Sequence, residues 1–457
     1  MISKENDVIY NPDACAFDTD PEGVKNALEK AINFVAEDIS CYVRDPSSDM
    51  TRKRVIGPEK VIKFLICKQG KSIASEICDQ VDEGQEFYPS AFCMQRYKIR
   101  HEAFIRVMAL LNKFLKPMRT FNGYYIVACD GSDVNIPFMK NEADYIIENK
   151  TGKNYCQLHL NALYDCLNGV YWDAEMTTPV KKMEPSALIA MALRKNFPAN
   201  SIIVCDRGYI TYKLIAFFNE ENQKFVIRSK DIDVSGSILE RFDFPDAEFD
   251  KTVSVTLTRN HPRYLSNKKK YAKINSDNDF PYIETWSDED YELTYRVVRF
   301  KLDDDTYETL VTNLTEDEMP FEYMKTLYHF RWSQEESYFT LKYKVGMIYL
   351  NSRKLEGVLQ EIYAGLIMFN VAGAMTYSVN VNDEKREKEK AKKKRQHDLK
   401  ANLSTAITNI RLFLRGKLSS AGLLNRIRMY VVPLRPGRSY PRNVRPQSLK
   451  PLNLRIS

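Results

Sequence analysis

The spacing of apolar residues along the chain predicts regions of different structure. Over residues 1–118 apolar side chains recur every three or four positions, which is typical of amphipathic helices. The run "NPDACAFDTDPEGVKNALEKAINFVAEDI" contains a helix-start signal, "DTDPEG", with a proline near the first turn. Two further helical patterns follow it, so we expect this N-terminal region to be mostly helical.

Residues 119–230 predict alternating strands and helices. "YYIVACDGSDVNIP" is a β-rich run, and "CQLHLNALYDCLNGVYWDAEM" reads as two strands joined by a hairpin turn at "CLNG". The helix "EPSALIAMALRKNF", the strand "SIIVC", the helix "YKLIAFFNEE" and the strand "KFVIRSK" come next. This order predicts a mixed α/β layer, a class of fold that places functional side chains at the carboxyl ends of its strands.

The rest of the chain changes character twice. Residues 231–316 hold β-branched runs such as "KTVSVTLTR" and "YELTYRVVRFKL" with no clear helix, so we expect a β-rich insertion. Helical patterns return over 317–380, where "YAGLIMFNVAGAM" is shorter than the roughly 18–20 apolar residues of a membrane span and predicts a buried helix. Residues 381–400 predict a charge-dense helix or linker, and the proline-containing tail predicts an extended segment.

The net charge of +6 is concentrated at the C-terminal end of the chain. Residues 401–457 contain eleven Arg or Lys and no Asp or Glu, which leaves a net charge of −5 on the other 400 residues. Such a basic tail, within the basic region 381–457, suits a polyanion such as the phosphate backbone of DNA or RNA. A solvated tail that only aids solubility has the same composition. Helical bundles with basic faces, here including Arg96 and Arg106, can dock on DNA, although a bundle without that role is more common.

Nine cysteines are scattered along the chain without a C-x-x-C pair, which predicts the reduced thiols of a cytosolic protein.

Two aspartates are the first candidates for chemistry. Asp130 and Asp206 each follow a short apolar strand, and each has a glycine close behind it. Two carboxylates held rigidly at the ends of neighbouring strands can share a hard cation such as Mg²⁺, whereas a single one is usually a turn or cap residue. Two Mg²⁺ ions about 4 Å apart need a further carboxylate. Asp133 is a rival to Asp130 but sits further from the apolar part of its strand.

The stretch "YHFRWSQEESYFTLK" offers Glu335 and Glu336 as the further carboxylate. On a helical wheel with about 100° per residue, Glu335 falls on a stripe about 60° wide and Glu336 falls outside it. The other members of the stripe are Tyr328, Arg331 and Lys342. Arg331 and Glu335 are also spaced to pair on one helix face. A salt-bridged surface helix would show the same pattern.

These residues and motifs together resemble the insertion-sequence-4 family of DDE transposases. The spacing Tyr328-x2-Arg331-x3-Glu335-x6-Lys342 matches the Y-R-E-K signature of that family, with "RW" in its usual context. "DGSDVNIP" resembles the family's first-aspartate block, "CDRGY" its second, and "KNYCQLHLNALYD" its second strand. The motifs follow the family's order over roughly residues 120–350, with a long gap before the glutamate that fits the family's β-strand insertion.

The resemblance implies an RNase H-like mixed sheet core interrupted by the insertion, with helical N-terminal and C-terminal regions. Asp130, Asp206 and Glu335 would be the catalytic triad and would hold two Mg²⁺ ions, for which Mn²⁺ can substitute. The tyrosine, arginine and lysine of the signature would contact DNA phosphates near the cleaved end. The activity that the resemblance implies is cut-and-paste transposition, with double-stranded DNA as partner. It also implies a homodimer in the DNA synapse and a location in the bacterial cytoplasm.

Other readings stay open. Some members of the family cut the second strand through a DNA hairpin with a flipped base, and Trp286 in the insertion is a candidate to stack on that base. A packed or exposed tryptophan without that role is the alternative. His159, on a strand, predicts a core or near-site histidine rather than a metal ligand. An RNase H-like nuclease without strand transfer, or a DNA-binding protein that has lost catalysis, would share many of these features, although an intact triad argues against the last.

Overall fold

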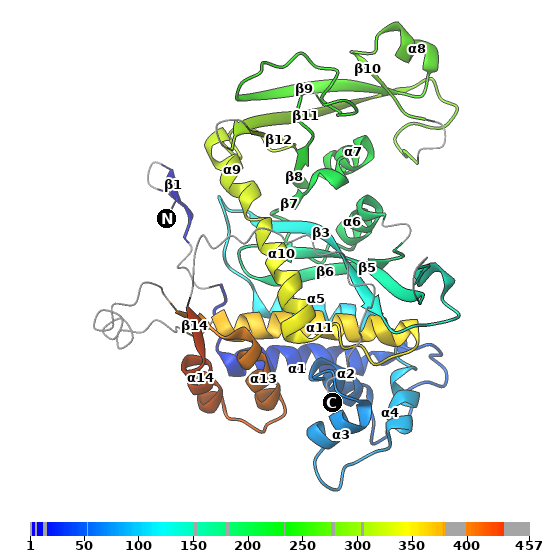
Figure 1. The fold of residues 1–457 in the computed structure, drawn as a ribbon, viewed down its shortest axis with the longest axis vertical. Helices are drawn as coiled ribbons and strands as arrows, with labels where there is room; N and C mark the ends of the chain where they lie inside the picture. Colours follow the sequence, from blue (N-terminus) through cyan, green and yellow to red (C-terminus); the bar gives the residue numbers. More distant parts are fainter. Residues whose placement is uncertain are drawn as a thin grey trace, which may run out of the picture.

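The computed structural model of the chain contains one large sheet flanked by helices (Figure 1). The predicted segment 381–400, apart from its last two residues, and the extended tail after residue 433 lie outside the described part of the chain. The described residues are 2–4, 7–11, 16–52, 54–149, 153–179, 183–232, 234–275, 279–302, 306–377, 379 and 399–433.

The N-terminal region is mostly helical, as its apolar spacing predicts. Its longest helix, α1, begins at the predicted signal: Pro21 is its first residue, and Asp20 accepts a hydrogen bond of 2.8 Å from the backbone nitrogen of Gly23. Helices α1 and α5 pack against the later helix α11, and the three lie side by side below the sheet in Figure 1. The elements are β1 (Ile2–Lys4), β2 (Asp7–Tyr10), α1 (Pro21–Glu37), η1 (Ile39–Tyr42), α2 (Pro58–Ile66), α3 (Ile73–Gln80), α4 (Pro89–Arg96) and α5 (Glu102–Leu115).

Ten strands of the described residues form the sheet, in the order β10–β9–β11–β12–β8–β7–β3–β5, with β4 and β6 both paired to β5. Strand β3 is antiparallel to β5 and parallel to β7, and β8 is parallel to β7. The predicted hairpin turn joins β5 to β6, where Gly169 takes a φ of +69° that favours glycine. The core elements are β3 (Tyr125–Ile136), β4 (Ile146–Ile147), β5 (Tyr155–Asp165), β6 (Val170–Thr177), α6 (Glu184–Arg194), β7 (Ser201–Cys205), α7 (Tyr212–Glu220) and β8 (Lys224–Ser229).

Alternation along the central strands sends side chains into two apolar clusters. Val127 of β3 belongs to the cluster that includes Leu188 of α6, and α7 contributes to the same cluster. Ile126 and Val204 belong to the other cluster, together with Leu327 of α9. Over this part of the central strands the sheet therefore has α6 and α7 on one face and α9 on the other.

The β-rich insertion is continuous with the core sheet. β12 pairs with β8, β11 with β12 and β9 with β11, all antiparallel, so the hydrogen bonding passes from the core into the insertion. The expectation of no helix here was wrong, because α8 begins after Asn260, which caps it by accepting a hydrogen bond from the backbone nitrogen of Arg263. The elements are β9 (Phe249–Thr258), α8 (His261–Ser266), β10 (Tyr271–Lys273), β11 (Asp290–Lys301) and β12 (Tyr307–Thr312).

The glutamate stretch is not the single straight helix that the wheel assumes. Helix α9 ends at His329, α10 starts after a turn, and a π-helix, η4, follows it directly. A π-helix closes its hydrogen bonds over five residues, so the angle that a regular wheel assigns to Lys342 does not hold. The elements are α9 (Phe321–His329), α10 (Trp332–Phe339), η4 (Thr340–Val345), α11 (Leu355–Tyr377), β13 (Leu399–Ala401), α13 (Leu403–Leu414), α14 (Ser420–Met429) and β14 (Val431–Pro433).

Helix α11 is the predicted buried helix and is longer than its apolar run. By length and composition alone it could cross a membrane, but 83% of its most apolar window is buried inside the protein. Core helices of soluble proteins have the same composition, so this helix is weak grounds for a membrane span.

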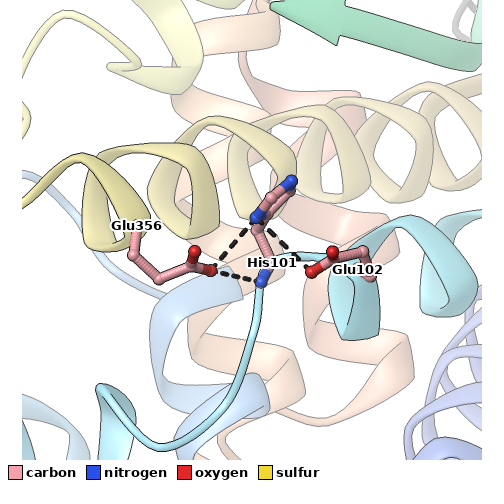
Figure 2. Close-up of side chains that lie close together, drawn as sticks. All are labelled: His101, Glu102 and Glu356. Atoms are coloured by element: carbon pink, nitrogen blue, oxygen red, sulfur yellow. Dashed lines mark hydrogen bonds and ion pairs between the residues drawn. The ribbon is translucent and has the colours of Figure 1, made fainter. Parts of the chain in front are cut away.

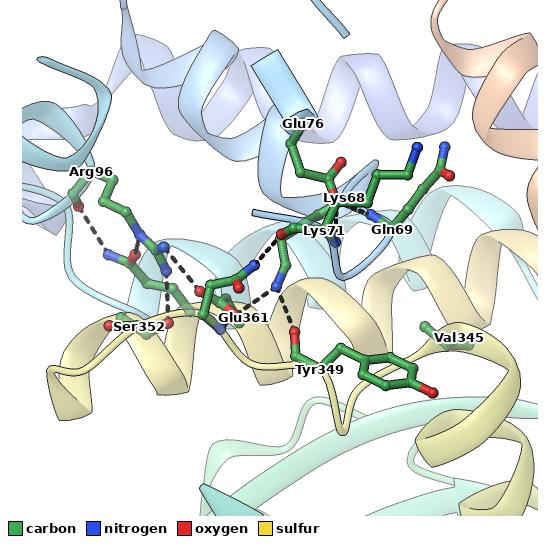
Figure 3. Close-up of polar contacts among 12 residues, drawn as sticks. Lys68, Gln69, Lys71, Glu76, Arg96, Val345, Tyr349, Ser352 and Glu361 are labelled. Atoms are coloured by element: carbon green, nitrogen blue, oxygen red, sulfur yellow. Dashed lines mark hydrogen bonds and ion pairs between the residues drawn. The ribbon is translucent and has the colours of Figure 1, made fainter. Parts of the chain in front are cut away.

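A buried polar network joins the N-terminal helices to α11 (Figure 3). The carboxylate of Glu361 accepts hydrogen bonds from Lys68 at 2.7 Å, from Arg96 at 2.9 Å and from the backbone nitrogen of Asn351 at 2.8 Å. Arg96 also donates to Gln360 and is 1% exposed. Its predicted place on a basic DNA-docking face was therefore wrong: the charge is used inside the protein.

Part of the positive charge of the tail is also used internally. Arg411 of α13 is buried and donates to the carbonyl of Val345, at the end of η4, at 2.8 Å. Arg415 donates to the carbonyl of Cys67. Six of the eleven basic residues of the tail lie beyond residue 433, outside the described part of the chain.

Candidate active site

The two predicted aspartates lie at the same level on neighbouring strands. In the parallel pair β3–β7, Cys129 is opposite Cys205, so Asp130 and Asp206 are the residues that follow this pair in the sequence. Alternation from Ile126 and from its counterparts on β7 points both carboxylates to the face that α9 covers. The structure thus brings together two side chains that are 76 residues apart in the sequence.

Only one of the two aspartates stands where the sequence places it. Asp206 directly follows β7, as predicted. Asp130 is not at the end of its strand, because β3 continues to Ile136 through antiparallel pairing with β5 after its pairing with β7 stops. The polar run "DGSDVNI" suggested a strand end, but its residues are polar because they line a partly exposed site.

Glu335 of α10 is the third carboxylate, and Arg331 connects it to the aspartates. Nη2 of Arg331 lies 3.8 Å from Oε1 of Glu335, and the guanidinium side chain is 7% exposed. Burial opposes the charge of Arg331, but Tyr328, Asp206 and Asp130 outweigh burial and raise the pKa of its guanidinium. The hydroxyl of Tyr328 donates to Asp206 at 3.5 Å. The tyrosine and arginine of the signature therefore act on the carboxylates in this structure.

Negative charge is crowded around Asp130. Burial raises the pKa of its carboxyl group; a hydrogen bond from the backbone nitrogen of Gly131 and the charge of Arg331 lower it, and Glu184 and Glu335 raise it. The net pKa of Asp130 lies above its ordinary value. A cation at this place would favour the charged carboxylate that burial and its neighbours disfavour.

Glu336 faces a different part of the protein. It lines a cavity of about 660 Å³, with Lys344 and Phe369 among the other lining residues and neither aspartate among them. Glu335 instead pairs with Arg331. The two adjacent glutamates are thus separated as the i,i+4 spacing suggests, although the helix is not regular beyond residue 339.

Lys342 lies in η4 and reaches the aspartate strand. Its Nζ donates to Oγ of Ser132 and to the carbonyl of Asp133, each at 2.7 Å. Burial lowers the pKa of this lysine, and Asp133 partly offsets that effect. The lysine of the signature is therefore held within hydrogen-bond distance of residues two and three positions after Asp130.

Sequence reasoning missed a fourth carboxylate, Glu184, the first residue of α6. Nε2 of His159 lies 3.0 Å from Oε1 of Glu184, and Nδ1 lies 2.7 Å from Oδ1 of Asp133. Burial lowers the pKa of His159, but the two carboxylates outweigh burial and raise it. Two carboxylate contacts suit a ring with both nitrogens protonated, because a neutral imidazole has one N–H. His159 is a near-site histidine, one of the two roles that its strand position predicted. Its place beside the aspartate motif was the one feature of the sequence that could have pointed to a further carboxylate such as Glu184.

Trp286 stands apart from these groups. It lies in the loop before β11 and is 95% exposed, so it is not a packing residue of the insertion. Its predicted contact with a flipped base stays a prediction.

The chemistry of the carboxylates fits a divalent cation. Asp130, Asp206 and Glu335 offer oxygen ligands, which Mg²⁺ and Mn²⁺ prefer. Of the described residues, those found with three ligand atoms all within 4.8 Å of one another are His101, Glu102 and Glu356.

Figure 2 shows this other group, in which His101 contacts Glu356 through its backbone nitrogen and through Nδ1. His101 is already paired, and the group joins the start of α5 to α11 without any member of the triad. We therefore place the candidate cation site at the aspartate pair, where burial and the neighbouring Glu184 and Glu335 disfavour the charge of Asp130.

Comparisons with known proteins bear on this site. Among solved structures, the chain is similar to the cryo-EM structure of a piggyBac transposase synaptic complex with hairpin DNA, with a TM-score of 0.38 and 10% sequence identity over 92% of this chain and 87% of that chain. A TM-score this low does not bear on the function of this chain. No curated protein matches the chain. A family model described as "Transposase DDE domain" matches residues 121–371, which is more than half of the chain and includes both aspartates and Glu335. The chain therefore belongs to the transposase DDE domain family, whose members cleave and transfer DNA strands.

Proposed function

We propose that the chain is the DNA transposase of an insertion sequence of the insertion-sequence-4 group. It would bind the terminal inverted repeats of its element, cleave the DNA at each end and join the freed 3′ ends to target DNA. The Y-R-E-K signature at Tyr328, Arg331, Glu335 and Lys342 supports the assignment to this group.

The observation that carries the proposal is the placement of three carboxylates from distant parts of the sequence. Asp130 and Asp206 follow residues that are paired on the parallel strands β3 and β7. Helix α10 contacts β3 and carries Glu335, which pairs with Arg331. The strand order β6–β5–β3–β7–β8, antiparallel up to β3 and parallel after it, is the arrangement expected of an RNase H-like core.

The residues of the chain would divide the work in a definite way. Asp130, Asp206 and Glu335 would hold two Mg²⁺ ions, or Mn²⁺ in their place, and bound ions of this kind activate the attacking oxygen and stabilise the leaving oxygen. The charge of Arg331 lowers the pKa of Asp130, and its guanidinium pairs with Glu335. Lys342 would exchange its contacts with the aspartate strand for a DNA phosphate near the cleaved end.

The partner would be double-stranded DNA, and the active assembly would be a homodimer that holds two element ends in a synapse. Because four described basic residues of the tail make contacts within the chain, the tail would contribute to DNA affinity mainly through the residues beyond 433. The activity would take place in the bacterial cytoplasm.

The test is cleavage and strand transfer of a labelled DNA that carries the element's end, in the presence of Mg²⁺. We expect Glu335→Gln to lower cleavage by on the order of a thousandfold, because an ion ligand acts directly in the reaction. Glu336→Gln is the matched control, since it removes the same charge one residue away, and should keep full activity. Equal activity of the two variants would refute the assignment of the triad.

The same assay separates the alternatives. Cleavage by the wild type without any joined product would indicate a nuclease without strand transfer. Binding of the end without cleavage would indicate a DNA-binding protein that has lost catalysis.

A further inference from the structure

Glu184 has a position that the start of a helix alone does not require. A glutamate in the first turn of a helix is favoured by the helix dipole and can point to solvent. Here its carboxylate is turned against the ends of the two central strands and contacts the ring of His159 at 3.0 Å. The side chain is 28% exposed, so it is open to solvent on one side and fixed on the other.

The two oxygens of Glu184 lie against the two aspartate motifs. A Cβ atom on Gly131, next to Asp130, would lie 2.7 Å from Oε1, and one on Gly208, two residues after Asp206, would lie 3.4 Å from Oε2. The glycine of the first motif therefore leaves space for the ring of His159, whose Nε2 would lie 2.2 Å from such a Cβ, and for this carboxylate, which lies near both motifs.

His159 fixes this carboxylate. Its side chain is 3% exposed, and its second nitrogen is bound to Asp133 at 2.7 Å. The carbonyl of Asp133 in turn accepts a hydrogen bond from Lys342. Glu184 is thus connected through His159 and Asp133 to the lysine of the signature.

We propose that Glu184 is a fourth carboxylate of the divalent-cation site, held in place by the His159–Asp133 pair. The inference rests on the proposed function, because it concerns the cation that the triad would bind. Asp130 and Asp206 would then lie between an acidic group from α6 and Glu335 from α10, so that a cation at the strand ends has oxygen ligands on both sides. His159 and Asp133 are positioning residues in this arrangement and do not touch the cation.

The first test is Mn²⁺ binding to the full chain without DNA, measured by the loss of the free-ion signal in electron paramagnetic resonance. We expect Glu184→Gln and Glu335→Gln each to weaken Mn²⁺ binding by about tenfold or more. Glu336→Gln should bind as the wild type does, since it lines a separate cavity. Circular dichroism and the unfolding temperature check that each variant is folded.

The outcomes separate the two proposals. If Glu335→Gln weakens binding and a folded Glu184→Gln binds as the wild type does, Glu184 is not a ligand and only this inference fails. If neither variant changes binding, the cation is not at the triad, and the proposed function fails with it.

A second test uses the unaltered protein, so it does not depend on the folding of a variant. Fe²⁺ bound in place of Mg²⁺, with ascorbate and peroxide, cuts the backbone near its ligands. We expect cuts near residues 130, 184, 206 and 335, all suppressed by excess Mg²⁺. Suppressible cuts near the other three positions without any near 184 would overturn the inference. His159→Gln should make the cuts near 184 weaker than those near 206, which a purely structural role would not do.

Discussion

Replacing Glu361 by Gln tests the buried network that joins the N-terminal helices to α11. The substitution keeps the size of the side chain and removes its negative charge. Lys68 and Arg96, which both donate to this carboxylate, would then remain buried without a counter-charge. The side chains of Glu361, Lys68 and Arg96 are 2%, 8% and 1% exposed, so water cannot replace the lost partner.

The size of the effect follows from the acidity of the carboxyl group. Burial by itself raises the pKa of Glu361, but the charges of Lys68 and Arg96, with hydrogen bonds from Lys68 and from the backbone nitrogen of Asn351, outweigh burial and lower it from 4.5 to about 2. At roughly 1.4 kcal/mol per pKa unit, the folded protein favours the charged form by ~3 kcal/mol. Removing one partner of a buried ion pair costs about 3–5 kcal/mol, and we expect a loss of this size at pH 7.

The pH dependence has a definite sign. Because the pKa in the folded protein is lower than the ordinary value of 4.5, the stabilisation is present above that pH and is lost as the pH falls towards 2. The wild type should therefore lose stability in this window more steeply than the Gln variant, whose side chain does not titrate.

The assay is urea unfolding at pH 7 and at several values down to pH 2, followed by circular dichroism. Glu29→Gln is the matched control, because Glu29 forms an ion pair of similar length with Lys63, at 2.8 Å, with both side chains more than a third exposed. Exposed pairs contribute about 0–1 kcal/mol, so this control should stay close to the wild type. Equal losses for the two variants, or parallel pH curves for Glu361→Gln and the wild type, would refute the reasoning.

Three further substitutions test other parts of the structure. Gly131→Ala places a methyl group against the buried ring of His159 and should lower the free energy of unfolding in urea by about 1–3 kcal/mol. Gly208→Ala meets ordinary contacts only and should cost less, so similar losses for the two variants would contradict the close packing inferred at Gly131. Arg331→Gln removes a charge that lowers the pKa of Asp130, so the acidic limb of the cleavage–pH profile should move to higher pH, and an unmoved limb would show that Asp130 does not titrate in it. Trp286→Ala should change stability by less than about 0.5 kcal/mol, since the ring is exposed. If the ring stacks on a flipped base, the variant should reduce second-strand cleavage but not the first nick, and unchanged products on a gel would exclude that role.

The order of strands and helices in the core was predictable because each element has a strong local signal. The runs around Val127, Ile203 and Val226 each contain at least three consecutive apolar residues, as buried parallel strands do, and glycine marks the turn between β5 and β6. The placement of Asp206 after its strand followed from the same signal.

What could not be predicted depends on contacts between distant residues. Nothing local indicates that β3 continues past Asp130, since the continuation is set by pairing with β5. The π-helix that directs Lys342 to Ser132 has no counterpart in the apolar spacing. Arg96 reads as a surface charge until its partner Glu361, more than 260 positions later, is known. The role of Glu184 likewise depends on a histidine in another strand.

The unbroken strand pairing from β8 to β9 has a mechanical consequence. β11 has 12 residues, which at ~3.3 Å per residue gives a length of about 40 Å. Neighbouring strands are hydrogen-bonded along β11, so the insertion is a continuous extension of the core sheet and not a separate domain joined by a flexible linker. A DNA duplex bound at the far end of β11 would therefore be held at a fixed distance from Asp206.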